Sequence, residues 1–340
     1  MKAAYVYEKE KMDIRELPTP KIGSGEALIE IVYAGVCGSD ITMYRGLHPT
    51  AKPPVVLGHE IFGVVREIDG RDDIKPGDRV TAEPLRFCGV CEACRQGFGN
   101  VCGSLRLHGI HMDGAYAQYV KVLSEKLVPI RTDIPDKLAA LAEPFAVAYH
   151  VCMRGNLRAG DDALVIGGGP IGTVVALMAR ACGANVTVSE PNPVRRANTE
   201  ALGLDAFDPV NGDADEMAAK KTGGPGFDVV FESSGSKAGI LSTTKLCKIH
   251  GTIVPMALAG TPVDFTLGQV SFKEQTVVGT RVYPFLHFKR GVETLEKLYA
   301  AGVALDPLIS DIMPLDMAQK AIDMMISGEN ACKILLDARA

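Results

Sequence analysis

The sequence predicts an α/β protein with two domains, one irregular and strand-rich and the other a doubly wound parallel sheet. The chain has 340 residues, which is too many for one comfortable hydrophobic core. Up to about residue 145, short alternating runs are separated by glycine and proline turns, as in a strand-rich domain. Further on, apolar runs of four to six residues alternate with helix-length segments. This alternation predicts βαβ units and a parallel sheet covered by helices on both faces.

The first domain is predicted to consist mainly of short strands. Turn signals such as Lys75-Pro76-Gly77-Asp78 separate them. A helical stretch, Leu138–Met153, then leads into the second domain. The expected strands are Ala27–Val32, Val55–Leu57, Ile61–Ile68, Asp78–Ala82 and Tyr116–Val122.

The second domain is predicted to follow a regular strand–helix order. Its expected strands are Ala163–Gly167, Val186–Glu190, Asp228–Glu232 and Thr252–Met256, and its expected helices are Ile171–Cys182, Val194–Leu202 and Ala238–Cys247. After Tyr283–Pro284, two helices (Lys289–Ala301 and Asp316–Ser327) precede a last strand, Lys333–Leu336. We expect this last strand to return to the first domain and complete it.

Four cysteines in one glycine-bearing loop predict a structural zinc site. Their spacing is Cys-x2-Cys-x2-Cys-x7-Cys, at Cys88, Cys91, Cys94 and Cys102. Thiolates at such spacing can surround one tetrahedral ion, and the loop has neither helical nor strand periodicity of its own. The metal must therefore supply much of its folding energy. A closed sulfur shell leaves no coordination position open, so the chemistry is expected elsewhere. Buried or disulfide-paired cysteines are the alternative interpretation.

A glycine motif between a predicted strand and a predicted helix indicates a dinucleotide site. In the run Gly167-Gly168-Gly169-Pro170-Ile171-Gly172, Gly167 is expected to make the tight turn. Gly169 lets the backbone approach a pyrophosphate, and Gly172 lets helix and strand pack closely. Pro170 suits the first helical turn, and the helix start at Ile171 offers N–H groups and a positive dipole end to phosphates.

The residues after the second strand of this unit bear on the choice of cofactor. Glu190 ends that strand about twenty residues after the glycines, where a carboxylate accepts hydrogen bonds from ribose hydroxyls. Its charge would repel a 2′-phosphate, which favours NAD over NADP. Arg195 and Arg196 follow closely and keep NADP open. A solvated charge at a strand end is the alternative interpretation of Glu190.

Two further segments carry residues suited to a second metal site. Cys37 lies in Gly35-Val36-Cys37-Gly38-Ser39-Asp40, and His59-Glu60 interrupts an apolar strand pattern. A lone cysteine is often a small buried hydrophobe and a lone histidine is often satisfied by the backbone, so spacing alone leaves both interpretations open. Glu143 lies in a mostly apolar helical stretch, where a buried carboxylate is costly unless it meets a cation.

These motifs together resemble the zinc-containing medium-chain alcohol dehydrogenases over nearly the whole chain. The carrying motifs are Cys37-Gly-Ser-Asp, Gly58-His-Glu with Gly63, Lys75-Pro-Gly-Asp-Arg-Val, the four-cysteine lobe, Asp113-Gly-Ala-Tyr-Ala-Gln-Tyr, Glu143-Pro and the glycine motif. The run Glu143-Pro-Phe-Ala-Val-Ala is similar to the polyol, sugar-acid, threonine and 2,3-butanediol dehydrogenases, whereas ethanol-type enzymes have a cysteine at that position. The resemblance implies a GroES-like catalytic domain over 1–148 and 286–340, with a zinc lobe at 86–104. It implies a Rossmann domain binding NAD over 149–285.

The resemblance also implies a catalytic zinc bound by Cys37, His59 and a carboxylate. The third position is filled by Glu143, by Glu60 or by a water held by a glutamate. We expect Glu143 to be the ligand and Glu60 to alternate with it or to support the site from behind. Ser39 matches the hydroxyl that passes the substrate proton outward, and Asp40 would brace the ligand imidazole.

Other residues acquire expected roles from the same resemblance. Thr42 stands where ethanol-type enzymes have the histidine that completes the proton relay, so water, the ribose hydroxyls, Tyr44 or His48 remain candidates for the outer path. Lys333 resembles a basic residue near the pyrophosphate and the His-Glu carboxylate, although a surface lysine is an equal alternative. His111, with His108 and Arg106, is a candidate for binding a polyol hydroxyl or a sugar-acid carboxylate. The remaining cysteines, Cys152, Cys182, Cys247 and Cys332, are expected to be packing residues.

The sequence thus predicts a zinc-dependent oxidoreductase that transfers a hydride from a secondary alcohol to NAD. Its expected substrate is a small polyol, sugar acid, diol or hydroxy-amino acid. An inactive zinc-binding scaffold and an NADP-dependent reductase are the alternatives. A net charge of −5 gives no basis for nucleic-acid or membrane-surface binding, and no eighteen-residue apolar run or signal peptide appears. Nine cysteines, four of them in one loop, suit a reducing compartment, so we expect a cytoplasmic protein. The resemblance implies a homotetramer or homodimer.

Overall fold

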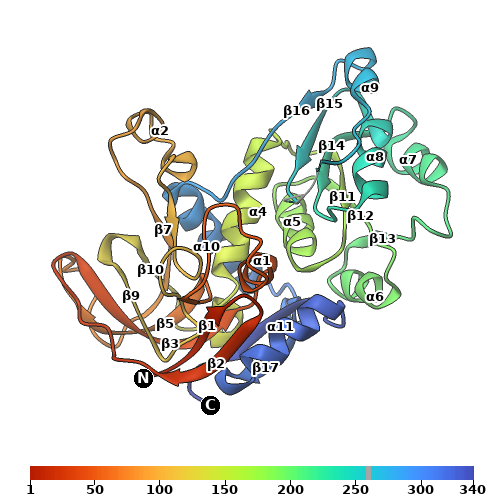
Figure 1. Ribbon diagram of the computed structural model, residues 1–340. Helices are drawn as coiled ribbons and strands as arrows, with labels where there is room; N and C mark the ends of the chain where they lie inside the picture. Colours follow the sequence, from red (N-terminus) through yellow and green to blue (C-terminus); the bar gives the residue numbers. More distant parts are fainter. Residues whose placement is uncertain (258–261) are drawn as a thin grey trace. The chain divides into compact units, whose positions relative to one another are not determined.

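The structure, a computed structural model, describes residues 1–257 and 262–340 and divides into two compact units (Figure 1). Unit 1 consists of residues 1–144, 284–299 and 309–340, and unit 2 of residues 145–283 and 300–308. The sequence-based division assigned all of 286–340 to the first domain, whereas 300–308 lies in unit 2. The reason is that the turn η3 (Asp306–Leu308) packs beside the helices α5 (Pro170–Ala181) and α6 (Pro193–Ala201).

Unit 1 is built mainly from strands. Its largest sheet has the order β10-β6-β5-β3-β18-β17, with β9 also paired to β3, and two smaller sheets have the orders β2-β1-β4 and β7-β8. The strands are β1 (Lys2–Glu8), β2 (Lys11–Glu16), β3 (Glu26–Gly35), β4 (Val55–Val56), β5 (Glu60–Ile68), β6 (Arg79–Ala82), β7 (Leu85–Arg86), β8 (Arg106–Leu107), β9 (Tyr119–Leu123), β10 (Leu127–Pro129), β17 (Ile309–Pro314) and β18 (Lys333–Asp337).

The helices of unit 1 are short except for those near the C-terminus. They are α1 (Gly38–Tyr44), α2 (Glu92–Arg95), α3 (Asp136–Ala139), α10 (Phe285–Ala300) and α11 (Ala318–Ser327), with 3-10 turns η1 (Gly99–Val101), η2 (Ser124–Lys126) and η4 (Leu315–Met317). The single helix expected at Leu138–Met153 is instead divided into α3 and α4 (Ala142–Arg154). Pro144 is the third residue of α4, where its missing N–H costs nothing, whereas in one continuous helix the Ala140 carbonyl would lose that donor.

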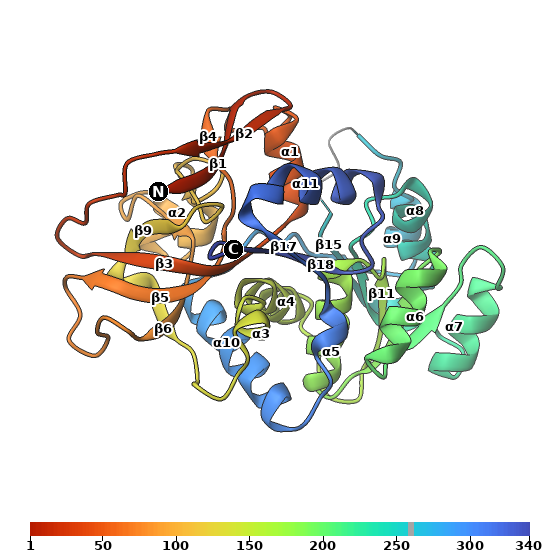
Figure 2. The same ribbon diagram turned by 90° about the horizontal axis from the view of Figure 1, so that it is seen from below.

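The C-terminal strand returns to unit 1 as the sequence predicted. β18 pairs antiparallel with β3, with Leu335 opposite Gly35, and it pairs in parallel with β17. Figure 2 shows α11 beside these two strands. β3 is nearly continuously apolar because it lies inside the sheet, between β5, β9 and β18. This arrangement brings Lys333, at the start of β18, to the end of β3.

Unit 2 is a six-stranded parallel sheet of the order β13-β12-β11-β14-β15-β16. The chain places β12 and β13 on one side of β11 and then crosses to the other side of β11, where β14, β15 and β16 follow. Figure 2 accordingly shows α5 and α6 on one face of the sheet and α8 and α9 on the other. The strands are β11 (Asp162–Ile166), β12 (Asn185–Ser189), β13 (Asp205–Phe207), β14 (Phe227–Glu232), β15 (Cys247–Pro255) and β16 (Thr276–Val277), and the remaining helices are α7 (Ala214–Thr222), α8 (Lys237–Leu246) and α9 (Leu267–Phe272). The predicted doubly wound sheet is confirmed.

Sequence patterns missed the more polar elements of unit 2. β13 and α7 were not predicted, because neither has a clear apolar stripe. The ends of α7 are nevertheless fixed locally: the Asp213 carboxylate accepts hydrogen bonds from the N–H groups of Asp215 and Glu216, and Gly223 ends the helix in a left-handed conformation. Throughout the described residues, no helix combines the length and apolar character needed to cross a membrane.

Candidate metal centres and cofactor site

Two neighbouring strand ends bring Cys37 and His59 together. β3 ends at Gly35, opposite Glu60 at the start of β5. Cys37 follows β3 as the N-cap of α1, and His59 directly precedes β5. As a result, ligand atoms of Cys37, His59 and Glu60 all lie within 4.8 Å of one another. The structure therefore joins two of the sequence segments singled out for a second metal site.

Asp40 organises this group from behind. Its Oδ2 accepts a hydrogen bond from the Cys37 N–H at 2.9 Å and another from the Tyr116 hydroxyl at 2.8 Å. Its Oδ1 lies 3.5 Å from His59 Nδ1, and the Asp40 side chain is completely buried. Asp40 thus fixes one ligand segment and orients the imidazole of the other. Tyr116, which is also fully buried, was not identified from the sequence, because a tyrosine in an apolar strand pattern carries no metal-site signal.

Glu60 is held on one side only. Its Oε1 accepts a hydrogen bond from Lys333 Nζ at 2.6 Å, and the same ammonium donates to the Val36 carbonyl at 3.1 Å. Its Oε2 is buried and has no hydrogen-bond partner in the described structure. A buried carboxylate oxygen without a partner is costly, so this atom is positioned for a cation.

The negative charges around the site favour the binding of a cation. Burial opposes protonation of His59, but the negative charges of Asp40 and Cys37 raise its pKa well above the usual value. Burial raises the pKa of the Glu60 carboxyl to about 7, although Lys333 acts in the opposite direction. The pKa values of His59 and Glu60 are thus both raised, so the site favours the protonated forms of these two side chains. The same donor set, with the buried Glu60 Oε2 lacking a hydrogen bond, fits a zinc ion.

Glu143 lies close to this group but outside it. It is in the first turn of α4 and is 6% exposed. Its charge raises the pKa values of both Glu60 and Lys333, so it is an electrostatic neighbour of the site. The group at ligand distance, however, contains Glu60 in the carboxylate position that we expected Glu143 to occupy.

Gly35 and Gly58 have no side chains, and this leaves room for the residues of the site. A Cβ on Gly35 would lie 1.8 Å from Glu60 Oε2, so any side chain there would displace the carboxylate. Gly58 has φ of +93°, and a Cβ there would lie 2.4 Å from the Tyr116 ring. Both constraints follow from strand pairing at a distance in the sequence, which explains why local patterns did not reveal them.

The candidate proton-path residues separate into two groups. Ser39 Oγ lies 3.4 Å from His59 Nε2, beside the metal-ligand group. Tyr44, by contrast, donates its hydroxyl hydrogen to the Glu10 carbonyl at 2.9 Å and accepts a hydrogen bond from Gln319 at 3.0 Å. Thr42 donates to the Gly38 carbonyl within α1 at 3.3 Å. Of these three hydroxyl groups, the one on Ser39 therefore lies next to a proposed zinc ligand.

The four lobe cysteines form a second group of ligand atoms (Figure 1, around α2). Four of their Sγ–Sγ distances are 3.4, 3.5, 3.8 and 3.9 Å. Sulfurs on a tetrahedral zinc with bonds of about 2.3 Å stand about 3.8 Å apart, which matches. Backbone N–H groups lower the pKa of Cys91 to about 6, whereas burial raises that of Cys94 to about 12, so the thiols of this group differ in how readily they become the thiolates that bind metal.

The remaining cysteines are outside both groups. Cys152, Cys247 and Cys332 are buried and Cys182 is half-buried. Burial raises the pKa of the Cys152 thiol and that of the Cys247 thiol, the latter to about 12. These thiols are therefore poor nucleophiles, as expected of packing residues.

The glycine motif joins β11 to α5 in the predicted way. Gly167 has φ of +103°, and a Cβ on Gly172 would lie 1.9 Å from the Gly167 carbonyl oxygen. Gly169 is the N-cap of α5 and Pro170 is its first residue, with Ile171 following. The N-terminal N–H groups of this twelve-residue helix provide the kind of positive end that binds phosphate.

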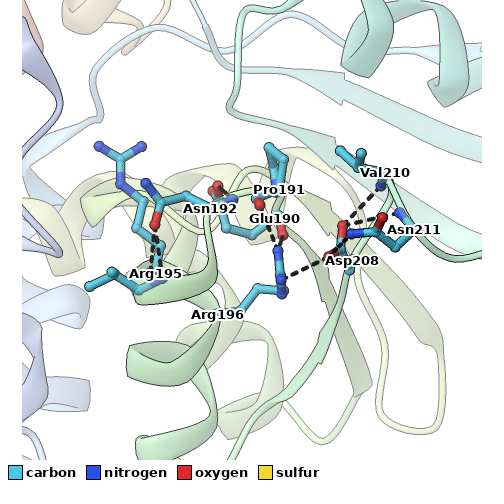
Figure 3. Close-up of polar contacts among 9 residues, drawn as sticks. Glu190, Pro191, Asn192, Arg195, Arg196, Asp208, Val210 and Asn211 are labelled. Carbon is cyan, nitrogen blue, oxygen red and sulfur yellow. Dashed lines mark hydrogen bonds and ion pairs between the residues drawn. The ribbon is translucent and has the colours of Figure 1, made fainter.

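Glu190 is built into the loop between β12 and α6. Its Oε2 accepts the Gly168 N–H at 2.7 Å. Its Oε1 accepts the Asn192 N–H at 2.8 Å (Figure 3). The side chain is 4% exposed, so the solvated-charge interpretation is wrong. Each carboxylate oxygen retains a second lone pair, and the carboxylate stands beside the glycine motif.

The two arginines of α6 differ in their surroundings. Arg196 donates to the carbonyls of Glu190 and Pro191 at 2.9 and 2.6 Å and pairs with Asp208 at 2.8 Å. In Figure 3 the Arg195 guanidinium points away from this cluster, and its Nη1 lies 4.0 Å from where a Gly169 Cβ would stand. The Arg196 side chain is therefore held by contacts with the loop, whereas that of Arg195 lies near the phosphate-binding turn.

Comparison with known proteins identifies the family. Residues 23–132 match the model of the alcohol dehydrogenase GroES-like domain, and residues 170–297 match that of the zinc-binding dehydrogenase. The chain belongs to the zinc-binding alcohol dehydrogenases. The predicted family and two-part fold are thus confirmed, and this dehydrogenase is an oxidoreductase that oxidises secondary alcohols with zinc and NAD(P).

Several relatives cover nearly the whole dehydrogenase. The chain is 36% identical to 2-dehydro-3-deoxy-L-galactonate 5-dehydrogenase of Pseudoalteromonas atlantica, with 93% of each chain covered. It is 32% identical to a sorbitol dehydrogenase of Halalkalibacterium halodurans, with 95% and 94% covered. A solved structure described as a zinc-binding dehydrogenase from Sinorhizobium meliloti 1021 bound to NADP is 32% identical, with a TM-score of 0.90 and 99% and 98% covered.

Proposed function

We propose that this chain is an NAD-dependent dehydrogenase of a secondary alcohol on a polyol or a hydroxy acid. The group formed by the half-buried Cys37 and the buried His59 and Glu60 is the observation that carries the proposal. The similarity to sugar-acid and sorbitol dehydrogenases supports the substrate class. The four-cysteine lobe would hold a structural zinc and take no part in the chemistry.

When bound, zinc supplies Lewis acidity that makes a substrate hydroxyl acidic, and the nicotinamide accepts the hydride. Cys37, His59 and Glu60 would hold that zinc. Asp40 keeps the His59 ring in position, and Lys333 holds the second oxygen of the Glu60 carboxylate. Ser39, 3.4 Å from the His59 ring, would pass the substrate proton toward solvent.

Exchanging the two glutamates for glutamine tests which one is the third ligand. Because Glu60 is at ligand distance, Glu60→Gln should weaken zinc binding at this site by more than about 100-fold, whereas Glu143→Gln should weaken it by about tenfold or less. Competition with a chromophoric chelator measures both values, and the lobe zinc is the internal control. If Glu143→Gln lost the ion and Glu60→Gln retained it, Glu143 would be the ligand.

The preference for NAD is attributed to Glu190. Its carboxylate would accept hydrogen bonds from the ribose hydroxyls and repel a 2′-phosphate, and Arg196 is held by Asp208 and two carbonyls. We expect NAD to give at least about tenfold higher kcat/KM than NADP. Glu190→Gln should remove most of this preference through KM, since the amide keeps the shape but not the charge.

A matched variant separates local charge from net charge in that experiment. Glu200→Gln makes the same change at an exposed position of α6 and should leave the NAD preference unchanged. Steady-state kinetics with both cofactors for the three proteins provides the measurement. An unchanged preference in Glu190→Gln would assign cofactor selection to other residues.

A substrate panel tests the function itself. The zinc-loaded enzyme should reduce NAD with at least one of a set of alditols, sugar acids, vicinal diols and β-hydroxy amino acids, followed by NADH absorbance. Because all these compounds carry secondary hydroxyls, activity toward primary alcohols alone would contradict the proposal. Complete inactivity with two zinc ions bound would favour the scaffold alternative.

Exposed apolar side chains at one sheet edge support the proposed homodimer or homotetramer. β16 is the edge strand of the unit 2 sheet, and Val277 on it is 44% exposed. Nearby in sequence, Leu267 and Phe272 are 70% and 92% exposed. An open apolar edge of this kind is suited to pairing with a second copy.

The nine cysteines, all in the described part of the chain, form no disulfide, which is consistent with the proposed cytoplasmic location.

A further inference from the structure

Three neighbouring strand ends of unit 2 meet at Glu232. This residue ends β14 and is paired in register with Ile166 of β11 and with Pro255 of β15. Ile166 directly precedes Gly167 of the glycine motif. In an open parallel sheet, ligands bind outside the carboxyl ends of the strands, at the point where the chain crosses to the other side of the first strand. Here that point lies between β11 and β14, so Glu232 stands at the edge of the cofactor crevice. Neither the metal-ligand group nor the cofactor contacts described above use its side chain.

The Glu232 carboxylate holds the loop that follows β14. Its Oε1 accepts hydrogen bonds from the N–H groups of Ser234 at 2.9 Å and Gly235 at 3.0 Å, and from the Ser234 hydroxyl at 2.5 Å. The side chain is 2% exposed, and a buried carboxylate is costly unless hydrogen bonds satisfy it. Gly235 has φ of +63°, a conformation that suits glycine. The three bonds to a charged acceptor therefore fix a tight turn at residues 233–235.

The same loop packs directly on the glycine turn. Ser233 Oγ donates to the carbonyls of Ile166 and Gly167, both at 3.0 Å. A Cβ on Gly167 would lie 2.9 Å from Ser233 Oγ and 3.0 Å from the Ser234 nitrogen. A Cβ on Gly172 would lie 2.6 Å from Ser233 Oγ. Because the loop and the glycine turn are in such close contact, a shift of the loop would also shift the turn.

The backbone around Glu232 connects the loop to two further elements. The Glu232 carbonyl accepts hydrogen bonds from the N–H groups of Met256 at 2.8 Å and Ala257 at 3.3 Å, just after β15. Ser236, the N-cap of α8, donates its N–H to Ser234 Oγ at 3.1 Å. The serine that Glu232 binds is thus also bound to the start of α8. One buried carboxylate lies at the centre of this network.

We propose that Glu232 is a positioning residue of the dinucleotide site, whose carboxylate holds the loop 233–235 against the glycine turn so that the turn is in its binding conformation before the cofactor arrives. The inference rests on the dinucleotide dependence of the proposed function and adds a residue to that site. A turn that is already ordered when the cofactor binds costs less binding free energy than one that becomes ordered on binding. Glu232 acts through the loop, whereas Glu190 is the carboxylate proposed to contact the cofactor.

Fluorescence titration with NADH and with NADPH tests the proposal. Glu232→Ala removes all three bonds to the loop and should raise the Kd of both cofactors by the same factor, roughly 10- to 100-fold. Glu232→Gln retains an oxygen acceptor and should stay within about fivefold of the wild type. The ratio of the two Kd values should not change, in contrast to the effect expected of Glu190→Gln. With saturating cofactor, kcat of Glu232→Ala should remain within about threefold of the wild type, because the metal-ligand group belongs to unit 1.

Hydrogen exchange of the cofactor-free protein provides a second readout. The N–H groups of Ser234 and Gly235 should exchange at least about tenfold faster in Glu232→Ala than in the wild type, and Glu232→Gln should restore most of their protection. Ser234→Ala removes the hydroxyl bond but keeps both N–H bonds to Glu232, so it should raise the Kd of NADH by about three- to tenfold. This milder variant decides the question if Glu232→Ala fails to fold.

A matched control and the possible outcomes separate this role from the proposed function. Glu216→Ala removes the same charge at an exposed position of α7 and should leave both Kd values unchanged. Wild-type affinity for NADH in a folded Glu232→Ala protein, or in Ser234→Ala where the former does not fold, would overturn the positioning role. Lower thermal stability with an unchanged Kd would overturn it too, since it would show a purely structural side chain. A wild-type enzyme that binds NADH but oxidises no alcohol would overturn the proposed function, and the Kd values would still decide the role of Glu232. Binding of neither dinucleotide by the wild type would overturn both.

Discussion

Replacing Cys37 by serine is expected to remove one of two zinc ions per chain and to lower kcat/KM by about 1,000-fold or more. The thiolate of Cys37 is one of the three groups gathered within 4.8 Å, and the other two come from a single neighbouring segment. Loss of a Lewis acid that contributes several kcal/mol to a barrier corresponds to a factor of this size. Metal analysis and steady-state kinetics measure the two effects on the same sample.

The fold should survive this substitution. Serine is a good N-cap, so α1 should still begin after residue 37, and Asp40 keeps its acceptor role toward the backbone N–H there. Cys182→Ser is the matched control, since Cys182 is half-buried and belongs to neither group of ligand atoms. If Cys37→Ser kept both zinc ions and full turnover, the metal group at the end of β3 would have no catalytic role.

The sequence was most informative where chemistry depends on local spacing. The four lobe cysteines lie within fifteen residues, and the glycine motif within six, so their residue order already contains the geometry. Strand–helix alternation likewise predicted the parallel sheet, because each element buries its own apolar face. The return of the C-terminal strand to the first domain was also predicted correctly, and its pairing with β3 in the structure explains how Lys333 reaches Glu60.

What the sequence left open depends on pairing between distant segments. From the sequence we expected Glu143 to be the third ligand, whereas the pairing of Gly35 with Glu60 brings Glu60 to the cysteine. The hydrogen bond of Tyr116 to Asp40 joins residues that are 76 positions apart. Arg196 looked available for a 2′-phosphate, but Asp208, on the segment after β13, pairs with it. Such contacts are fixed by register and packing, which one-dimensional patterns do not contain.

The lobe zinc should matter for stability rather than for turnover. Replacing Cys102, the buried member of the group, by serine should release this ion and unfold residues 86–104. The lobe has little apolar packing to replace the metal: Val90, Phe98 and Val101 are 71%, 54% and 45% exposed. Structural zinc contributes about 10–16 kcal/mol to the folding of small zinc domains, so its loss should open the lobe almost completely. Limited proteolysis should then cut within 86–104 at least about tenfold faster than in the wild type.

The boundary of this unfolding is set by contacts at the base of the lobe. Lys126 pairs with Glu83 at 2.5 Å, and both residues lie outside the lobe, so the segments below it are tied together without the metal. The catalytic group at Cys37 should therefore keep its zinc in Cys102→Ser, and kcat of the intact fraction should remain within about threefold of the wild type. Cys182→Ser again controls for the loss of a thiol. A Cys102→Ser enzyme that resisted protease like the wild type would show that the lobe folds by packing alone, because the metal would then contribute nothing that the chain does not supply.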